Sequence, residues 1–322
     1  MTAKPFSLNL ANLLLPAVLF AVSLSVGVAD FRWSDVFSLS DSQQVMFISR
    51  LPRTFAIVLT GASMAVAGMI MQILMRNRFV EPSMAGAGQS AALGLLLMSL
   101  LLPAAPLPVK MSVAAVAALI GMLVFMLLIR RLPPTAQLMV SLVGIIFGGV
   151  VEAVATFIAY KNEMLQMLGV WQQGDFSSVL LGRYELLWIT GGLAVFAYLI
   201  ADRLTILGLG ETVSVNLGLN RTAVLWSGLI IVALITSLVI VTVGNIPFIG
   251  LVVPNIVSRL TGDRLRQSLP AVALLGASMV LLCDILGRMI VFPFEIPVST
   301  VFGVLGTALF LWLLLRKPAH AV

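Results

Sequence analysis

The sequence alternates between long apolar stretches and short polar breaks along its whole length. A helix needs about 20 apolar residues to cross the hydrocarbon core of a bilayer. Stretches of about that length, bounded by charged residues, proline and glycine, predict ten membrane-spanning helices. The predicted spans are 10–28, 54–75, 84–102, 109–129, 138–160, 184–202, 223–243, 246–260, 268–290 and 297–315.

Two of the predicted spans differ from the others. The eighth is short and contains Pro247, Gly250 and Pro254, so we expect a broken helix that protein rather than lipid surrounds. The first follows Lys4 in the manner of a signal peptide, but its apolar region is longer than the 7 to 15 residues typical of such a segment. We therefore expect it to be a retained helix.

Composition narrows the class of protein. Of the 322 residues, 60% are hydrophobic and only 10% are charged, and the mean hydropathy is +1.11. These values exclude a water-soluble core, so we expect an all-α polytopic membrane protein with one domain over residues 1–322. The single cysteine, Cys283, permits no intramolecular disulfide and gives no information on the redox compartment.

The distribution of positive charge predicts the orientation, because loops rich in Lys and Arg stay on the cytoplasmic side. With ten spans and the N-terminus inside, twelve of the nineteen Lys and Arg residues fall on the inner side: Lys4, Arg76, Arg78, Arg130, Arg131, Arg203, Arg221, Arg259, Arg264, Arg266, Arg316 and Lys317. Seven fall outside: Arg32, Arg50, Arg53, Lys110, Lys161, Arg183 and Arg288. The excess predicts that both termini are cytoplasmic, and it leaves the outer arginines to be explained.

The sequence lacks the residues that several kinds of chemistry require. No Gly-Lys dipeptide occurs, so the phosphate-binding P-loop pattern is absent and the chain is not expected to hydrolyse ATP by that route. The only histidine is His320, which excludes a His-based transition-metal site and a Ser-His-Asp triad. We expect no metal site, no cofactor in this chain and no catalytic residues.

Charged residues inside predicted spans are costly and frequently functional. Glu152 lies in the middle of the fifth span. It is either the site of an ion-coupled secondary transporter or a protonated or hydrogen-bonded glutamate at a helix interface. Asp284 and Arg288 are four residues apart near the outer end of the ninth span, where they can form an ion pair along the helix.

Five stretches resemble, in order and along nearly the whole chain, the permease subunits of ATP-binding-cassette importers for iron chelates, haem and cobalamin. They are "RLPRTFAIVLTGASMAVAGMIMQ" (50–72), "RNRFVEP" (76–82), "GLGETVSVNLGLN" (208–220), "GNIPFIGLVVPNIVSRLTG" (244–262) and "LLGASMVLLCDILGRMIVFPFEIPVSTVFGVLGTALFLWLLLRK" (274–317). The resemblance implies ten spans per subunit in a bacterial inner membrane. It also implies partners: a second permease subunit, identical or a sister chain, two ATPase subunits that bind ATP and Mg²⁺, and a substrate-binding protein.

The resemblance gives the outer arginines a role. In the cobalamin importer, glutamates of the binding protein dock onto outward arginines of the permease, and the matching positions here are Arg50, Arg53 and Arg288. Guanidinium groups suit carboxylate partners because they can pair bidentately. The alternative is contact with lipid headgroups or with nearby acids such as Asp41.

On the inner side, the resemblance implies a cytoplasmic coupling segment at about 205–221 that transmits ATPase closure as rigid-body motion. Its candidate contact residues are Glu211, Leu217 and Gly218, with Gly218 as the turn. The alternative is a loop helix that lies on the membrane surface.

In the cobalamin importer, two cytoplasmic loops close the transport path. The matching residues in this chain form a candidate cytoplasmic gate: Asn77, Phe79, Thr135 and Ala136. Phe79 has the bulk and apolarity that a plug requires, and the alternative is that all four are ordinary turn residues.

The chain departs from the family pattern at three places: Arg78 replaces a proline, Asn255 replaces a histidine, and Gly306-Thr307-Ala308 replaces Gly-x-Pro. Without that histidine we expect a non-coordinating path through which a bulky chelate slides. "RNRFVEP" resembles the subgroup associated with ferric catecholate siderophores. The resemblance therefore implies an importer permease for a ferric siderophore, with haem or cobalamin as the alternative substrate.

Two further expectations concern packing and the outer surface. The spacing of Gly61, Ala65 and Gly68 fits close helix packing in the bundle centre. Residues 161–183, with Met167 and Trp171, either line the outer entrance or pack against the bundle.

Overall fold

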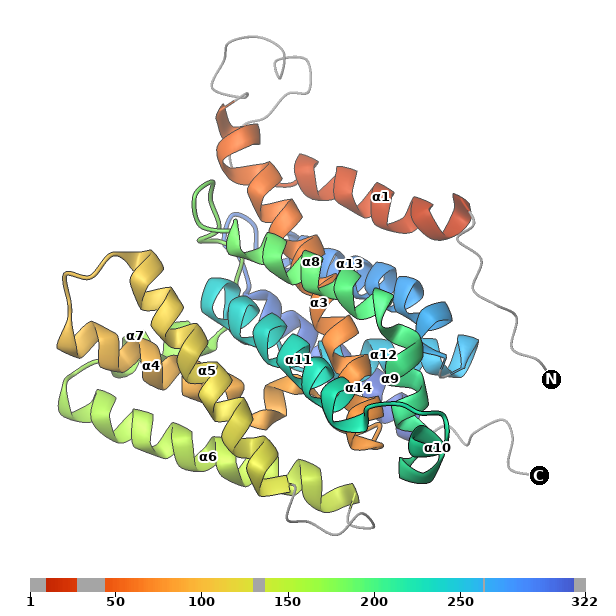
Figure 1. Ribbon diagram of the computed structural model, residues 1–322. Helices are drawn as coiled ribbons and strands as arrows, with labels where there is room; N and C mark the ends of the chain where they lie inside the picture. The colour runs from red at the N-terminus through yellow and green to blue at the C-terminus, as the bar shows by residue number, and fades with distance from the viewer. Residues whose placement is uncertain (1–9, 28–43, 130–136, 263, 316–322) are drawn as a thin grey trace.

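The computed structural model describes residues 10–27, 44–262 without 130–136, and 264–315, and within these ranges it contains helices and no strand. Figure 1 shows the helices packed into one bundle. The helices are α1 (Leu10–Ser25), η2 (Met46–Arg50), α3 (Leu51–Met75), η3 (Pro82–Ala85), α4 (Ala87–Leu101), α5 (Leu107–Ile129), α6 (Gln137–Lys161), α7 (Leu165–Gln172), α8 (Leu186–Leu199), α9 (Ala201–Gly208), α10 (Glu211–Asn216), α11 (Arg221–Val243), α12 (Ile249–Thr261), α13 (Leu265–Ile290) and α14 (Val298–Leu315).

The predicted spans all have helical counterparts in the described part of the chain. Six helices are long and apolar enough to cross a membrane, α8 and α9 form one bent pair, and three shorter apolar helices (α1, α4 and α12) complete the ten. The prediction of an all-α polytopic membrane protein is therefore confirmed, and the count of about ten holds when the bent and short helices are included.

Helix α3 lies at the centre of the bundle and packs against α13, α11, α12 and α8 (Figure 1). Its small residues make this packing close, as predicted. A Cβ added at Gly61 would lie 2.5 Å from the carbonyl oxygen of Gly276, and one at Gly68 would overlap the backbone of Gly250. Ala65 is fully buried between these two crossings. The backbones can approach because these positions carry little or no side chain.

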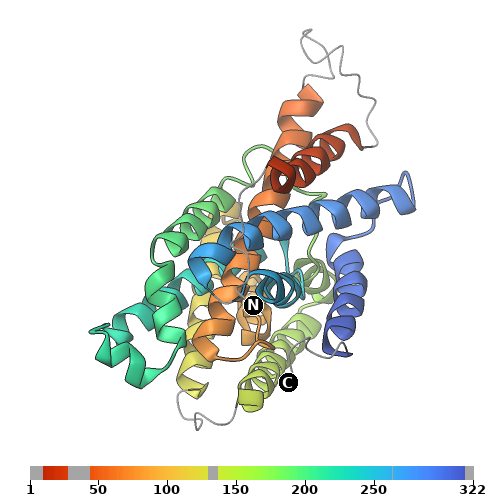
Figure 2. The same ribbon diagram turned by 90° about the vertical axis from the view of Figure 1, so that its right-hand side faces the viewer.

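Two helices, α6 and α14, have the least protein around them. Of the residues in the apolar core of each span, 72% are buried in the helix that includes α3, against 22% in α6 and 28% in α14. Figure 2 shows α6 and α14 at the lower right of the molecule, with α5 on the other side of α6. This margin is exposed within the single chain.

Three elements differ from the expected pattern. Helix α12 is continuous through Pro254 and begins at residue 249, after Phe248 adopts a left-handed conformation with φ of 69°. The expected sixth span bends by 64° between α8 and α9, without a proline or glycine at the break. The segment 161–183, which the charge distribution predicts to face outward, contains a helix, α7, that the apolar pattern did not predict.

Candidate functional site

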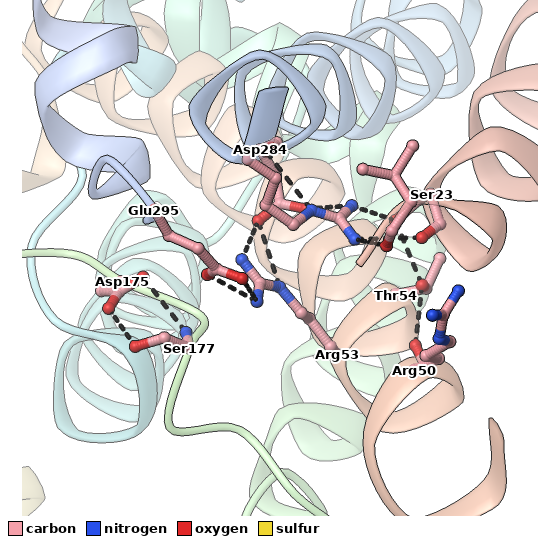
Figure 3. A network of polar contacts seen from close by, with 10 residues as sticks. Ser23, Arg50, Arg53, Thr54, Asp175, Ser177, Asp284 and Glu295 are labelled. Carbon is pink, nitrogen blue, oxygen red and sulfur yellow. Dashed lines mark hydrogen bonds and ion pairs between the residues drawn. The ribbon is translucent and has the colours of Figure 1, made fainter. Parts of the chain in front are cut away.

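At the end of the bundle that the charge distribution predicts to face outward, here called the outer end, Arg53 is held between two carboxylates (Figure 3). Its Nη2 lies 2.7 Å from Oδ1 of Asp284, and its Nη1 lies 2.8 Å from Oε2 of Glu295. The Arg53 side chain is only 12% exposed and that of Asp284 is fully buried. These contacts join α3, α13 and the segment before α14, because the three residues come from different parts of the chain.

Arg288 joins the same network from α13. Its Nη2 lies 2.5 Å from Oδ2 of Asp284, four residues earlier, which confirms the predicted pairing along the helix. Its guanidinium also donates to the hydroxyl of Ser23 at 2.8 Å and to the carbonyl of Val26 at 2.6 Å. Arg288 therefore ties α13 to the C-terminal end of α1.

Arg50 binds the same end of α1. Its Nη1 donates to the carbonyl oxygen of Leu24 at 2.6 Å, and its side chain lies close to Gly27. The last carbonyls of a helix lack intrahelical donors and carry partial negative charge, so two arginines stabilise them. This explains how three guanidinium groups share a site with only two carboxylates.

The three arginines that the resemblance assigns to docking all belong to this outer network of hydrogen bonds and ion pairs. Arg50 and Arg288 are 7% and 5% exposed, and Arg53 is engaged by Asp284 and Glu295. Asp41, the neighbouring acid considered from the sequence, lies outside the described residues. The docking role of the three arginines stays a prediction.

The candidate gate lies in the loop from α3 to η3. Asn77 is buried, and its Oδ1 accepts the backbone N–H of Phe79 at 2.9 Å. Phe79 is 42% exposed and meets Phe310 of α14 edge to face, with the ring centroids 6.2 Å apart. Thr135 and Ala136 lie outside the described residues, so only one of the two gate loops is placed.

Helix α12 holds this loop at two points. The side-chain amide of Asn255 donates to the carbonyl oxygen of Arg78 at 2.9 Å, so two of the departures from the family pattern contact each other. The carboxylate of Glu81, almost fully buried, accepts the backbone N–H of Phe248 at 3.2 Å and the hydroxyl of Ser83. Burial raises the pKa of Glu81 above its ordinary value, and these two donors partly oppose the rise.

Sequence reasoning did not identify Glu81 or Glu295 as structural partners. Glu81 stands in the quoted motif "RNRFVEP", which is the one signal that could have drawn attention to it. Glu295 meets Arg53 across 242 positions of sequence, and no local pattern marks that contact.

The candidate coupling segment forms α9 and α10. The hydroxyl of Ser214 donates to the carbonyls of Gly210 at 2.5 Å and Ile206 at 3.1 Å, which holds α10 against α9. Leu217 is 63% exposed. Gly218 adopts a φ of 71° with open space around it, as a turn glycine does. For Glu211 the structure describes the backbone position, at the start of α10.

The tip of this segment is apolar and uncovered. Four side chains, all at least 38% exposed, form the coupling tip: Leu209, Val213, Val215 and Leu217. An exposed apolar group of this kind marks an interaction surface. The geometry fits a partner that covers the tip, and it fits a membrane surface equally.

The outer segment 161–183 both packs and borders a hollow. Trp171 packs against the hydrophobic core and also lines an outer cavity of about 300 Å³ with Asp175 and Arg183. Met167 is exposed. Within the described residues, no group of three or more His, Cys, Asp or Glu side chains gathers at one place.

Comparison with known proteins places this arrangement in a family. The sequence matches the FecCD transport family over residues 14–316. It is 48% identical to the petrobactin import system permease protein YclN of Bacillus subtilis (strain 168), over 94% of this chain and 96% of that protein. It is 39% identical to the petrobactin import system permease protein FatD of Bacillus anthracis, over 98% of this chain and 92% of that protein.

A solved structure shares the fold. A metal-chelate type ABC transporter in an inward-facing conformation superposes with a TM-score of 0.82, at 24% identity, over 94% of this chain and 97% of that chain. The match along almost the full length of both chains confirms the permease fold that the resemblance implied. The chain is therefore a member of the FecCD transport family.

Proposed function

We propose that this chain is the permease subunit of an ATP-binding-cassette importer that moves a ferric siderophore across the bacterial inner membrane into the cytoplasm. The observation that carries the proposal is the whole-length similarity to two petrobactin import permeases. Petrobactin is accordingly the first chelate to test. A haem or cobalamin permease is the alternative that the same fold permits.

The proposed assembly contains a second permease subunit, identical or a sister chain, two ATPase subunits and a substrate-binding protein. The ATPases bind ATP and Mg²⁺, so this chain needs no cofactor of its own. The coupling tip supports the ATPase contact, because its apolar side chains protrude with nothing from the described chain to cover them. In the proposed assembly, α10 and both termini lie on the cytoplasmic side of the membrane.

Docking of the binding protein proceeds by exchange of partners at Arg53. Glu295 is the more exposed of the two carboxylates on Arg53, with 26% of its side chain accessible. A carboxylate of the binding protein can replace it, whereas Asp284 is fully buried and stays in place. Arg50 and Arg288 then support the site by fixing α1 beneath it.

The gate closes through Phe79. Its ring packs on Phe310 of α14, and Asn77 fixes the turn that carries it. Thr135 and Ala136 complete the gate from the loop between α5 and α6. An aromatic pair of this kind stabilises the closed loop by about 1 kcal/mol. Movement of the loop driven by the ATPases can overcome this energy.

An uptake assay tests the proposed function. Cells lacking their own siderophore permeases receive this chain with its ATPase, its binding protein and any sister permease that accompanies it. They are then given radiolabelled ferric petrobactin, a ferric trihydroxamate, haem or cobalamin. We expect ATP-dependent accumulation of ferric petrobactin. Accumulation of haem or cobalamin alone would favour the alternative substrates, and uptake that persists without the ATPase would contradict the importer.

A further inference from the structure

The exposed surface of α6 divides into two flanks of different chemistry. One carries apolar side chains at helical spacing, each at least 47% exposed: Ile146, Val150, Val154 and Phe157. Next to it, at positions three to four residues apart, lie Gly149, Glu152, Thr156 and Tyr160, here called the polar flank. Residues three, four, seven and eight apart share one side of a helix. The apolar flank suits lipid tails, and the polar flank does not.

Glu152 has no hydrogen bond or ion pair to any other part of the described chain. A carboxylate in a membrane span is costly unless it faces protein or a water-filled cavity. Beside Glu152 the surface of α6 is open, and the residues that border this open surface all come from α6: Gly149, Glu152, Ala153, Thr156, Phe157 and Tyr160. No other helix of the described chain covers the carboxylate there, so it is free to bind a further group.

The polar surface continues from α6 onto the first turn of α4. A Cβ added at Gly148, one turn before Glu152, would lie 3.4 Å from Oε1 of Gln89. This oxygen is buried and has no hydrogen-bond partner. One buried polar atom without a partner therefore lies about one helical turn from Glu152.

The position of α6 in the bundle agrees with this chemistry. Helix α6 and helix α14, which carries Phe310 of the candidate gate, are the two spans with the least protein around them. A substrate path lined by these two helices would pass the polar flank before it reached the gate.

We propose that the polar flank is a contact site for the ferric chelate in the transport path, with Glu152 as its specificity-determining residue. An ionised carboxylate only accepts hydrogen bonds, and the hydroxyls of Thr156 and Tyr160 both donate and accept. The site therefore takes a chelator with outward hydroxyl, amide N–H or ammonium groups. It contacts the chelator and not the iron, since one carboxylate provides too few ligands. The inference rests on the proposed function.

Thiol accessibility tests whether the flank faces water. The chain has one cysteine, and Cys283 is 2% exposed, so an introduced cysteine reacts against a low background. Thr156→Cys probes the polar flank, and Val154→Cys is the matched control on the apolar flank. In the assembled importer a charged, membrane-impermeant thiol reagent should label Thr156→Cys at least about tenfold faster, because only a hydrated thiol ionises readily. Equal labelling rates would overturn the proposal.

Substrate dependence tests the contact itself. Glu152→Gln should weaken the apparent affinity for ferric petrobactin by about tenfold, the factor expected for loss of a charged hydrogen bond. Glu163→Gln, an exposed acid just beyond the outer end of α6, is the control and should leave uptake unchanged. Unchanged affinity in Glu152→Gln would overturn the contact role.

The outcomes separate this inference from the proposed function. If ferric petrobactin is not imported at all, the proposed function fails, whereas the labelling difference between the two flanks can still be measured. If import is normal and Thr156→Cys labels no faster than Val154→Cys, only the inference fails. Uptake that follows a proton gradient without ATP and is lost in Glu152→Gln would instead identify an ion-coupled carrier and overturn both.

Discussion

The two ends of the molecule differ in whether the chain itself covers their unusual side chains. At the outer end, Arg50 and Arg288 are buried and Arg53 is partly buried, and all three are paired with carboxylates or helix carbonyls of the same chain. At the inner end, the coupling tip exposes its apolar side chains. The outer charges are satisfied internally, and the inner apolar groups are left for something else to cover.

The difference separates what builds the subunit from what the subunit offers to others. A buried ion network stabilises only while all its members remain, because an unpaired buried charge is costly. An exposed apolar tip contributes little to the fold and gains energy only on association. Substitutions at the outer end should therefore reduce stability, and substitutions at the inner end should reduce assembly.

The largest effect is expected at Arg288. Arg288→Leu leaves Asp284 with less compensation and frees the end of α1, so we expect unfolding in mild detergent to become easier by about 3–5 kcal/mol. The measurement is thermal or denaturant unfolding. Arg183→Leu, at an exposed outer position, should change stability little. A stable Arg288→Leu protein would show that the network is not needed for the fold.

The next effect is expected at the coupling tip. Leu217→Asp should weaken ATPase binding by about 2 kcal/mol, or roughly thirtyfold, because a buried leucine contributes about that much. Thermal stability of the isolated chain should not change. Asn216→Asp, which adds the same charge one residue away, is the control. Equal loss in both variants would point to charge alone, and no loss in either would favour a tip that rests on the membrane.

The contact between α12 and the gate loop should have an intermediate effect. Asn255→Ala removes the hydrogen bond to the carbonyl of Arg78, so we expect a local loss of about 1 kcal/mol. Hydrogen exchange of residues 76–82 should become about fivefold faster while exchange in the centre of α3 stays the same. Unchanged exchange in the loop would show that Asn255 does not hold it.

A similar energy is expected at the aromatic pair of the gate, where the readout is leak through the path. Phe79→Ala removes about 1 kcal/mol of ring packing against Phe310, and leak of a preloaded chelate from proteoliposomes should rise. Phe157→Ala on the apolar flank removes an exposed ring of the same size and should not raise the leak. If Phe79→Ala does not raise the leak, residue 79 is not part of a gate.

The smallest effect is a pH dependence at Glu81. Its pKa is raised by burial, so the folded protein binds its proton more tightly than the unfolded chain. This stabilising contribution is complete below the ordinary carboxyl pKa of about 4.3 and is lost as the pH rises through the higher folded value. Glu81→Gln should lack this loss, which unfolding curves at a series of pH values would show as a flatter profile. Identical profiles would exclude the effect.

Much of the fold could be predicted because hydrophobicity determines which segments span a membrane. The close crossings at Gly61 and Gly68 followed from small residues at helical spacing. The bend between α8 and α9 could not be predicted, because Leu199, Ile200 and Ala201 carry no breaking signal. The start of α12 depends on the left-handed Phe248, a conformation that phenylalanine rarely adopts.

The candidate sites were predictable where they depend on local spacing. Asp284 and Arg288 lie one helical turn apart, so their pairing could be predicted and is confirmed. The partner Glu295 lies far from Arg53 in sequence, and only the packing of α13 and the segment before α14 brings the two together. Asn255 was expected only to remove a histidine, and its contact with Arg78 requires the fold.

The most direct test of the account is purification of tagged protein from its native membrane in gentle detergent, with mass spectrometry of the proteins that accompany it. We predict a stoichiometric companion that carries a P-loop, together with a second permease subunit of the same or a sister sequence. A chain that is isolated alone and still carries substrate under a proton or sodium gradient would contradict the importer assignment.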